Sequence, residues 1–215
     1  MKKNKTKKAI ILSALFLGPL IFYIFLSLGI YHHANLPILT EKVEDVKGNV
    51  TFKNHFSVVS FLGTETEKNQ GRLFNLNEVI YKRYRKSLYF QSVLIAPKGA
   101  EKQVNTLKKK LSTYTDISNW KFVFMNDVDI KSLFKSFDSP YTIGKDLSSE
   151  YVFIVDRELR LRGRKDDEDT DNGRLYGYNM TSVNDLKNKM KKDIEIIYYQ
   201  LKKSLEKEKR FKRKI

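Results

Sequence analysis

The sequence predicts an α/β fold, a mixed β-sheet with helices on both of its faces, preceded by one N-terminal transmembrane helix. Apolar runs of strand length alternate with amphipathic helical patterns through the middle of the chain. A later run, rich in β-branched and aromatic residues, leads into alternating apolar and basic residues, a pattern typical of an antiparallel hairpin. A long uncharged segment precedes these elements. With 215 residues, 41% hydrophobic and 31% charged, the chain has room for one folded domain beside that segment.

The uncharged segment is Ala9–Tyr31. At about 1.5 Å per residue a helix of this length extends roughly 34 Å, enough to cross a hydrocarbon core of about 30 Å. A cleaved signal peptide is the alternative, but its apolar part is usually shorter and ends in small residues. Here the segment ends in Leu28, Gly29, Ile30 and Tyr31. We therefore expect residues 9–31 to be a retained membrane anchor.

Charge around the anchor predicts its orientation. Lysines precede the span in residues 1–8, and no lysine or arginine follows directly after it. By the positive-inside rule, residues 1–8 lie in the cytoplasm and the remaining domain lies outside it. The predicted location is thus the cell (inner) membrane, with a single span and an extracytoplasmic domain. Beyond the anchor we expect a linker at 32–48, the folded domain at 49–205 and a basic tail at 206–215.

The formal net charge of +16 raises the possibility of nucleic-acid binding. Much of that charge is concentrated at the two ends of the chain, however, and no zinc-finger spacing or aromatic–basic RNA motif accompanies it. We expect no nucleic-acid partner. The tail 206–215 is either a solvated segment or a contact for anionic lipid.

The order of elements defines the sheet. Three strand–helix alternations imply parallel strands joined by right-handed crossovers, and the later hairpin adds antiparallel strands. Together they predict a thioredoxin-like arrangement. The expected strands are Phe56–Leu62, Phe90–Ala96, Trp120–Met125, Tyr151–Val155 and Leu159–Arg164.

Helices are predicted by apolar periodicity and by capping residues. Asn75 is placed as the N-cap of a helix over 75–86, with Glu78 at the capping-box position. The last and longest helix carries an apolar stripe from Val183 to Leu205. The other expected helices cover residues 100–112 and a short segment from Asp127 to Phe137.

One hairpin carries a family resemblance. Tyr151–Val155, followed by Asp156-Arg157 and then Leu159–Gly163, resembles the "FLVDR-x-G-x-I-R-G" hairpin of SCO/SenC proteins. The single N-terminal anchor is similar to theirs as well. The resemblance implies a membrane-anchored thioredoxin fold of the kind that delivers copper during cytochrome c oxidase assembly. It further implies a copper site made of two cysteines in a CxxxC loop and one histidine.

The chain departs from the family at that site, because its 215 residues contain no cysteine. The corresponding loop is Gly63–Asn69, with Glu65 and Asn69 nearest to the two cysteine positions. The histidine position falls near Asp146–Ser149, where no histidine occurs. Carboxylate and amide oxygens prefer hard ions and do not hold Cu(I). We therefore assign no catalytic, cofactor-binding or metal-binding residue and expect no cofactor. The protein is expected to be a non-enzymatic partner-binding or assembly factor, linked to the respiratory chain by analogy alone.

A second hypothesis concerns the acidic loop Asp166–Gly173, which could bind a divalent cation or a small ligand. An EF-hand starting at Asp167 would need glycine at its sixth position and glutamate at its twelfth, but Asn172 and Tyr178 occupy them. A solvated loop is the simpler interpretation. Isolated polar residues are interpreted as packed or solvated side chains; they are His32, His33, His55, Glu65 and Glu67.

Overall fold

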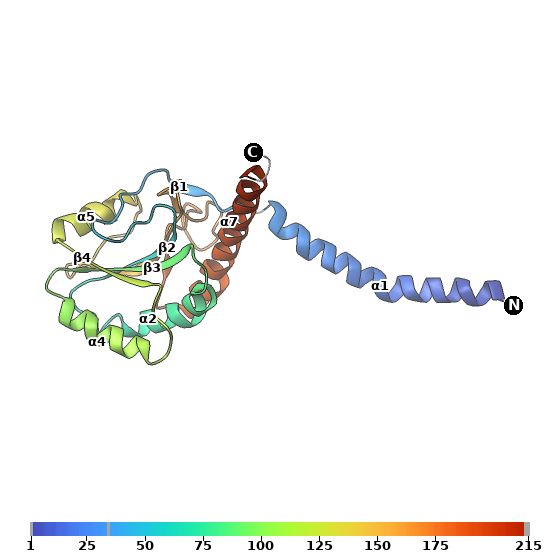
Figure 1. The fold of residues 1–215 in the computed structure, drawn as a ribbon, viewed down its shortest axis with the longest axis horizontal. Helices are drawn as coiled ribbons and strands as arrows, with labels where there is room; N and C mark the ends of the chain where they lie inside the picture. The colour runs from blue at the N-terminus through green and yellow to red at the C-terminus, as the bar shows by residue number, and fades with distance from the viewer. Residues whose placement is uncertain (1, 34, 213–215) are drawn as a thin grey trace. The chain divides into compact units, whose positions relative to one another are not determined.

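A mixed seven-stranded β-sheet lies at the centre of the computed structural model, which describes residues 2–33 and 35–212 (Figure 1). Six strands follow one another in the order β1-β6-β5-β2-β3-β4, and β7 pairs with β5. Strands β2, β3 and β4 are parallel, whereas β5 is antiparallel to β2, β6 and β7. Their bounds are β1 Ile38–Thr40, β2 Phe56–Leu62, β3 Phe90–Pro97, β4 Trp120–Met125, β5 Ser148–Val155, β6 Leu161–Arg162 and β7 Tyr178–Asn179.

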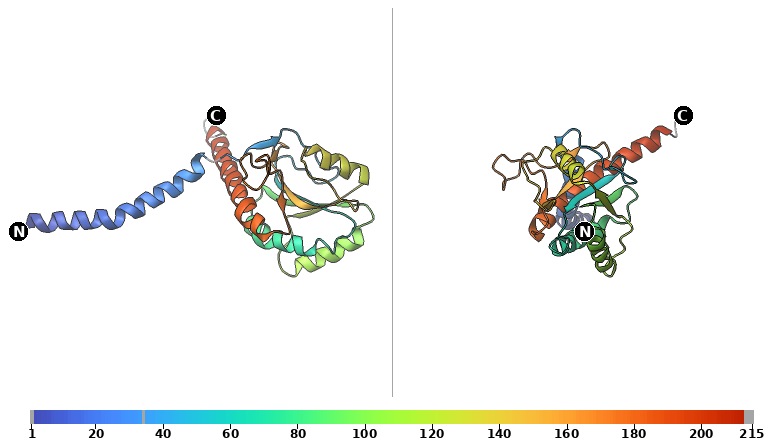
Figure 2. Two further views of the ribbon diagram at one scale, coloured as in Figure 1. Left: turned by 180° about the vertical axis from the view of Figure 1, so that it is seen from behind. Right: turned by 90° about the vertical axis from the view of Figure 1, so that its left-hand side faces the viewer.

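Helices cover both faces of this sheet. Helix α5 lies on one face, and α2 and α4 lie on the other (Figures 1 and 2). Two helical segments contain a π-helical turn, η1 and η2, each flanked by α-helix. The bounds are α1 Lys2–His33, α2 Gln70–Leu76, η1 Asn77–Tyr81, α3 Lys82–Tyr84, α4 Glu101–Ser112, α5 Asp127–Ser136, α6 Val183–Asp185, η2 Leu186–Met190 and α7 Lys191–Lys212.

The chain divides into two units. Residues Leu36–Glu195 form the unit that contains the whole sheet, and we call it the sheet unit. The other unit combines Met1–Asn35 with Ile196–Ile215, and in it the side chain of Gln200 donates a hydrogen bond to Asn35 at 2.8 Å. The candidate site described below lies entirely within the sheet unit.

The core between the sheet and α5 is rich in phenylalanine. Phe61 of β2 makes edge contacts with Phe134 of α5 and with Phe137 at ring-centroid distances of 5.1 and 5.8 Å. Phe153 of β5 contacts Phe137 at 4.8 Å. These three strand and helix elements therefore share one interlocked aromatic cluster, which fixes where β2 and β5 end relative to α5.

The opposite face of the sheet packs against α2, η1 and α4. Val104, Leu107 and Leu111 are the buried residues of α4, at the helical spacing that the sequence predicts. Tyr81 of η1 contacts Trp120 of β4 at 4.9 Å. Both faces of β2 and β3 are buried along their whole length, which explains why these strands are apolar without alternation.

The predicted strand arrangement is confirmed. Phe56–Leu62 and Trp120–Met125 form strands with the predicted bounds, and Phe90–Pro97 extends the predicted strand by one residue. The mixed sheet flanked by helices is the thioredoxin-like arrangement expected from the order of elements.

The prediction that Asn75 caps a helix is wrong. The helix begins at Gln70, so Asn75 lies inside α2, where its side-chain amide donates to the carbonyl of Met180 at 3.1 Å. A capping sequence can therefore occur within a helix when a distant residue supplies the hydrogen bond of the side chain. Here that residue is Met180, 105 positions away.

The predicted strand Leu159–Arg164 is shorter than expected. Leu159 has a φ of 63°, and only Leu161–Arg162 forms β6. The carboxylate of Asp156 accepts hydrogen bonds from the backbone amides of Glu158 and Arg160, both at 3.0 Å, and so holds these residues in a turn. The sequence analysis also missed two short strands: β1 lies in the predicted linker and β7 follows the acidic loop.

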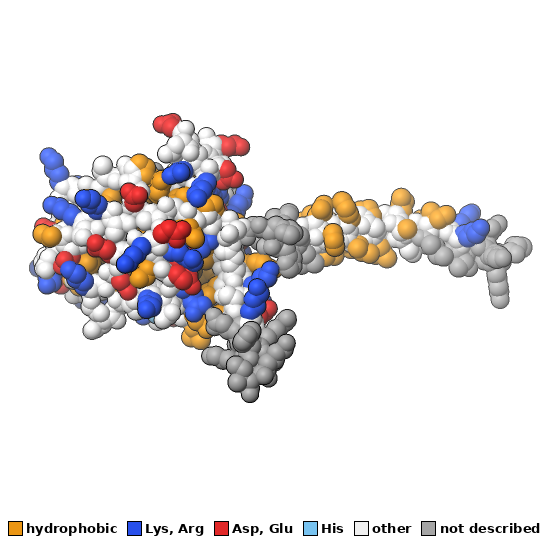
Figure 3. All heavy atoms as spheres, turned by 90° about the horizontal axis from the view of Figure 1, so that it is seen from above, with side chains coloured by type: hydrophobic (Ala, Val, Ile, Leu, Met, Phe, Trp, Pro, Cys, Tyr) orange, Lys and Arg blue, Asp and Glu red, His pale blue; other side chains and the backbone are white. Residues whose placement is uncertain are grey.

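Helix α1 includes the segment predicted to span a membrane. Its described side chains, residues 7, 8 and 11–26, include large apolar residues that are well exposed, such as Phe25 at 74% (Figure 3). Among the residues that the structure describes, no helix meets the length and hydropathy needed to cross a membrane. The side chains of residues 9, 10 and 27–31, which belong to the predicted span, lie outside the described residues.

A matched pair of substitutions tests the apolar stripe predicted for the last helix, Val183 to Leu205. Ile194 is fully buried, whereas Val183, which the periodicity places on the same stripe, is 48% exposed. Ile194→Asp buries an unpaired carboxylate and should lower the free energy of unfolding by about 3 to 5 kcal/mol. Val183→Asp adds the same charge in the first turn of the helix. It should change the free energy of unfolding by less than about 0.5 kcal/mol. Urea denaturation followed by circular dichroism measures both values, and equal losses would contradict the structure.

Candidate functional site

The structure brings together the two segments that the sequence analysis predicts to correspond to the copper-ligand positions of SCO/SenC proteins. The backbone amide of Thr64, directly after β2, donates to the carbonyl of Asp146 at 2.9 Å. Gly63 has a φ of +67°, and a Cβ atom added there would lie 2.5 Å from the same carbonyl oxygen. Only glycine permits this approach. We call the two segments, residues 63–70 and 144–150, the paired loops.

The first of the paired loops forms a tight turn that leads into α2. Backbone amides of Lys68, Asn69 and Gln70 each donate to the carbonyl three residues earlier, at 3.1 to 3.2 Å. Thr66 and Asn69 are 1% exposed, whereas Glu65 is exposed and forms an ion pair with Lys68. The two positions nearest to the family's cysteines thus differ: Glu65 faces solvent and Asn69 faces the interior.

Asn69 is the centre of a polar chain that joins the paired loops. Its side-chain nitrogen donates to the carbonyl of Leu62 at 2.6 Å, and its side-chain oxygen accepts from Arg72 at 2.9 Å. Arg72 in turn forms an ion pair with Glu150 of β5 at 2.5 Å. The sequence analysis missed Arg72 and Glu150, because they lie 78 residues apart and belong to no motif.

The second of the paired loops is stabilised by its own hydrogen bonds. The carboxylate of Asp146 accepts from the backbone amide and the hydroxyl of Ser148, at 3.2 and 2.8 Å. The amide of Gly144 donates to the carbonyl of Ser148 at 2.9 Å. Pairing between β2 and β5 is irregular beside this loop, between Ser60 and Leu62. Such bulges re-aim side chains at the ends of strands.

A groove with a volume of about 490 Å³ opens beside the paired loops. The rings of Tyr141 and Tyr151 stack in its wall with centroids 3.8 Å apart. Burial raises the pKa of Tyr141 to about 12, so at neutral pH its hydroxyl stays protonated and donates to the carbonyl of Gly177 at 3.3 Å. Arg72 and Glu150 border the same groove. It offers hydrogen-bonding groups and flat aromatic surface, and none of its lining residues is a thiol.

Neither a family model nor any of the curated proteins matches this sequence. Solved structures do match. The BsSco protein, a member of the Sco family of cytochrome c oxidase assembly proteins, aligns with a TM-score of 0.50 and 15% identity over 77% of this chain and 95% of its own. The chain has a Sco-like thioredoxin fold.

Two further structures have lower scores. Copper-bound ScoI from Arabidopsis thaliana aligns at a TM-score of 0.44 with 16% identity, covering 68% of this chain and 89% of its own. The thioredoxin domain of a thiol-disulfide oxidoreductase from Bacteroides vulgatus aligns at a TM-score of 0.41 with 19% identity. The alignment covers 72% of this chain and 91% of that domain. At these identities the likeness concerns the fold.

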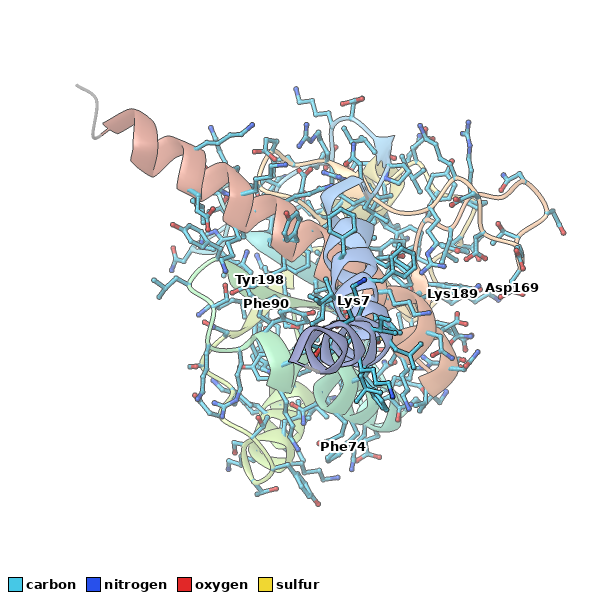
Figure 4. All side chains as sticks on the ribbon, turned by 90° about the vertical axis from the view of Figure 1, so that its right-hand side faces the viewer. Lys7, Phe74, Phe90, Asp169, Lys189 and Tyr198 are labelled. Atoms are coloured by element: carbon cyan, nitrogen blue, oxygen red, sulfur yellow. The ribbon has the colours of Figure 1, made fainter. Side chains whose placement is uncertain are left out.

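The acidic loop is anchored through one aspartate, and its interpretation as a wholly solvated loop is wrong at that position. Asp167 is only 4% exposed and pairs with Lys189 of η2 at 2.8 Å. The same ammonium group binds the exposed Asp169 at 2.6 Å (Figure 4). These hydrogen bonds raise the pKa of Lys189 although burial alone would lower it. Two carboxylates that share one ammonium group are already neutralised in part, which disfavours a cation.

A second ion pair fastens the same region to α7. Arg164 binds Asp193 at 2.7 Å, and Asp193 also accepts from the hydroxyl of the buried Tyr178 at 2.7 Å. Burial raises the pKa values of Asp193 and Tyr178. Within the described part of the chain, no three His, Cys, Asp or Glu side chains are grouped closely enough to hold a metal ion. Asp167, Asp169 and Asp193 are each engaged in ion pairs with Lys189 or Arg164.

The remaining candidate residues are separate from the paired loops. A ring nitrogen of His55 lies 3.0 Å from the carbonyl of Lys53. The hydroxyl of Ser60 contacts the sulfur of Met180 at 3.6 Å, and Met180 is fully buried. The side chains of His32 and His33 lie outside the described residues.

Two glycines of the same region provide a test of the loop contact. Gly63→Ala should lower the free energy of unfolding by at least about 1 to 3 kcal/mol, because the positive φ is strained for alanine and the added carbon meets backbone atoms. Gly71→Ala, at a helical position with nothing within 4 Å, should raise it by up to about 1 kcal/mol. Urea titrations of both variants give the two values. An unchanged free energy of unfolding in Gly63→Ala would refute the close approach of the paired loops.

Proposed function

We propose that this protein is a membrane-anchored, non-catalytic Sco-like factor that binds a partner protein at the paired loops. The observation that carries the proposal is the hydrogen bonding at the junction of those loops. The backbones of the two loops meet, and the side chain of Asn69 binds the backbone carbonyl of Leu62 and the side chain of Arg72, which in turn pairs with Glu150.

Chemistry supports binding over catalysis. Thiol–disulfide exchange requires a thiolate, and the sequence has none. Of the polar groups in the groove, Tyr141 holds its proton at neutral pH, and Arg72 is paired with a carboxylate. Neither arrangement activates a nucleophile. A partner, by contrast, can use the groove's hydroxyl groups and stacked tyrosines, because hydrogen bonds around an aromatic anchor are common in protein interfaces.

The anchor and the cellular role are further parts of the proposal. The uncharged segment 9–31, the lysines before it and the exposed apolar side chains of α1 support a single span with the sheet unit outside the cytoplasm. A role in respiratory-chain assembly rests on analogy with the family to which BsSco belongs. Contact of the basic tail 206–215 with anionic lipid remains a secondary part of the same hypothesis.

Affinity purification from membranes tests the proposal. The tagged full chain should remain in the membrane fraction after an alkaline carbonate wash and should then co-purify with a partner from detergent extracts. Thr142→Arg places a long charged side chain in the groove and should abolish recovery of that partner.

The matched control is Val128→Arg on α5, because Val128 is 77% exposed and lies outside the groove. This variant should recover the partner as the unmodified chain does. Equal recovery with Thr142→Arg would show that the groove is not the binding surface. Release of the chain by the carbonate wash would refute the anchor.

A further inference from the structure

A second groove lies between the first paired loop, with the start of α2, and helix α4. Its volume is about 290 Å³. Thr66, Glu67 and Gln70 line one wall, and Lys102, Thr106 and Lys110 line the other, so the two lysines outnumber the one carboxylate. We call it the α2–α4 groove. Because Thr66 belongs to the first paired loop, the groove is continuous with the candidate site.

Helix α4 is far more basic than the helix on the opposite face of the sheet. Its sequence contains four lysines and one glutamate, a net charge of +3. Helix α5 contains two lysines and two aspartates, a net charge of zero. On the side of the molecule where α5 lies, basic and acidic side chains are interspersed (Figure 3). The basic character of α4 is therefore a local property and not only a consequence of the net charge.

The lysines of α4 are not neutralised locally. Across the described side chains, Lys102, Lys108, Lys109 and Lys110 form no ion pair, as is also true of Lys131 and Lys135 of α5, but in α4 four such lysines share one helix. Lys110 instead donates a hydrogen bond across the groove to the side-chain oxygen of Gln70 at 3.0 Å. An amide is a weak partner for an ammonium group, so an incoming carboxylate would gain a charge-assisted hydrogen bond there.

The α2–α4 groove also has apolar surface. Leu107, which is 3% exposed, contributes to its lining, and the aliphatic stems of the lysines add to it. Phe74 of α2, labelled in Figure 4, meets Tyr114, two residues after the end of α4, edge to face at a centroid distance of 4.8 Å. Tyr114 is 62% exposed. Exposed aromatic surface beside positive charge suits a peptide that carries both acidic and apolar side chains.

We propose that the α2–α4 groove binds an acidic segment of a partner protein, with carboxylates of that segment reaching Lys102 and Lys110 and an apolar side chain contacting Phe74 and Tyr114. This inference rests on the proposed function, since it assigns the chemistry of the partner. The partner then contacts the first paired loop in the α2–α4 groove and the second paired loop in the groove of Tyr141 and Tyr151.

Selection of peptides from a random 16-residue phage library against the full chain in detergent micelles tests the chemistry. Enriched peptides should carry a net negative charge and at least one aromatic or large aliphatic residue. The double variant Lys102→Glu/Lys110→Glu should weaken their binding by about ten-fold or more, and added salt should weaken binding to the unmodified chain.

The control is Lys131→Glu/Lys135→Glu on α5, which changes the net charge equally on the opposite face of the sheet. It should alter binding by less than about two-fold. Enrichment of basic or uncharged peptides, absence of enrichment, an equal loss in both double variants, or tighter binding of a single-stranded oligonucleotide would each overturn the proposal.

The membrane purification separates this inference from the proposed function. If the partner co-purifies with Lys102→Glu/Lys110→Glu as well as with the unmodified chain, the α2–α4 groove does not bind the partner. The partner-binding function then stands. If no partner co-purifies with the unmodified chain, the proposed function fails instead.

Discussion

The close approach of two backbone segments, Gly63 against Asp146, is the constraint on which the candidate site depends. A side chain at position 63 would collide with the opposite loop, so the contact requires a residue without Cβ in a left-handed conformation. Once the backbones meet, the buried amide of Asn69 can satisfy the carbonyl of Leu62 and also accept from Arg72. A buried polar side chain is stable only when such partners are present, so the loop geometry and its internal hydrogen bonds depend on one another.

A second set of contacts fixes the strands that carry these loops. Three ion pairs brace this region: Arg162 with Asp156 within the hairpin, Arg164 with Asp193 of α7, and Lys189 of η2 with Asp167 of the acidic loop. Each pair unites residues from different turns or elements, and removal of one partner would leave a buried charge uncompensated. The hairpin that resembles the SCO/SenC motif is thus held by its own ion pairs, because Asp156 binds both Arg160 and Arg162.

The sequence predicted the central strands well and the site poorly, for a physical reason. Strands such as Phe56–Leu62 are buried on both faces, so their apolar runs alone define them. Short strands such as β1 form through pairing with distant residues, and no local pattern indicates them. The same limit applies to Arg72 with Glu150, and to Asp167, whose burial depends on Lys189 in a different element. The absence of cysteine is a property of the sequence itself and could be read directly.

We propose that the paired loops keep the backbone arrangement of a thioredoxin-like site without its metal or redox chemistry. Titration of the purified chain with Cu(I) against a strong competing chelator tests it most directly, with Glu65→Cys/Asn69→Cys as the variant that introduces two thiols at the family's positions. The account predicts no Cu(I) retained by the unmodified chain, because oxygen ligands do not hold this soft ion. Stoichiometric Cu(I) that survives competition in the unmodified chain would contradict it.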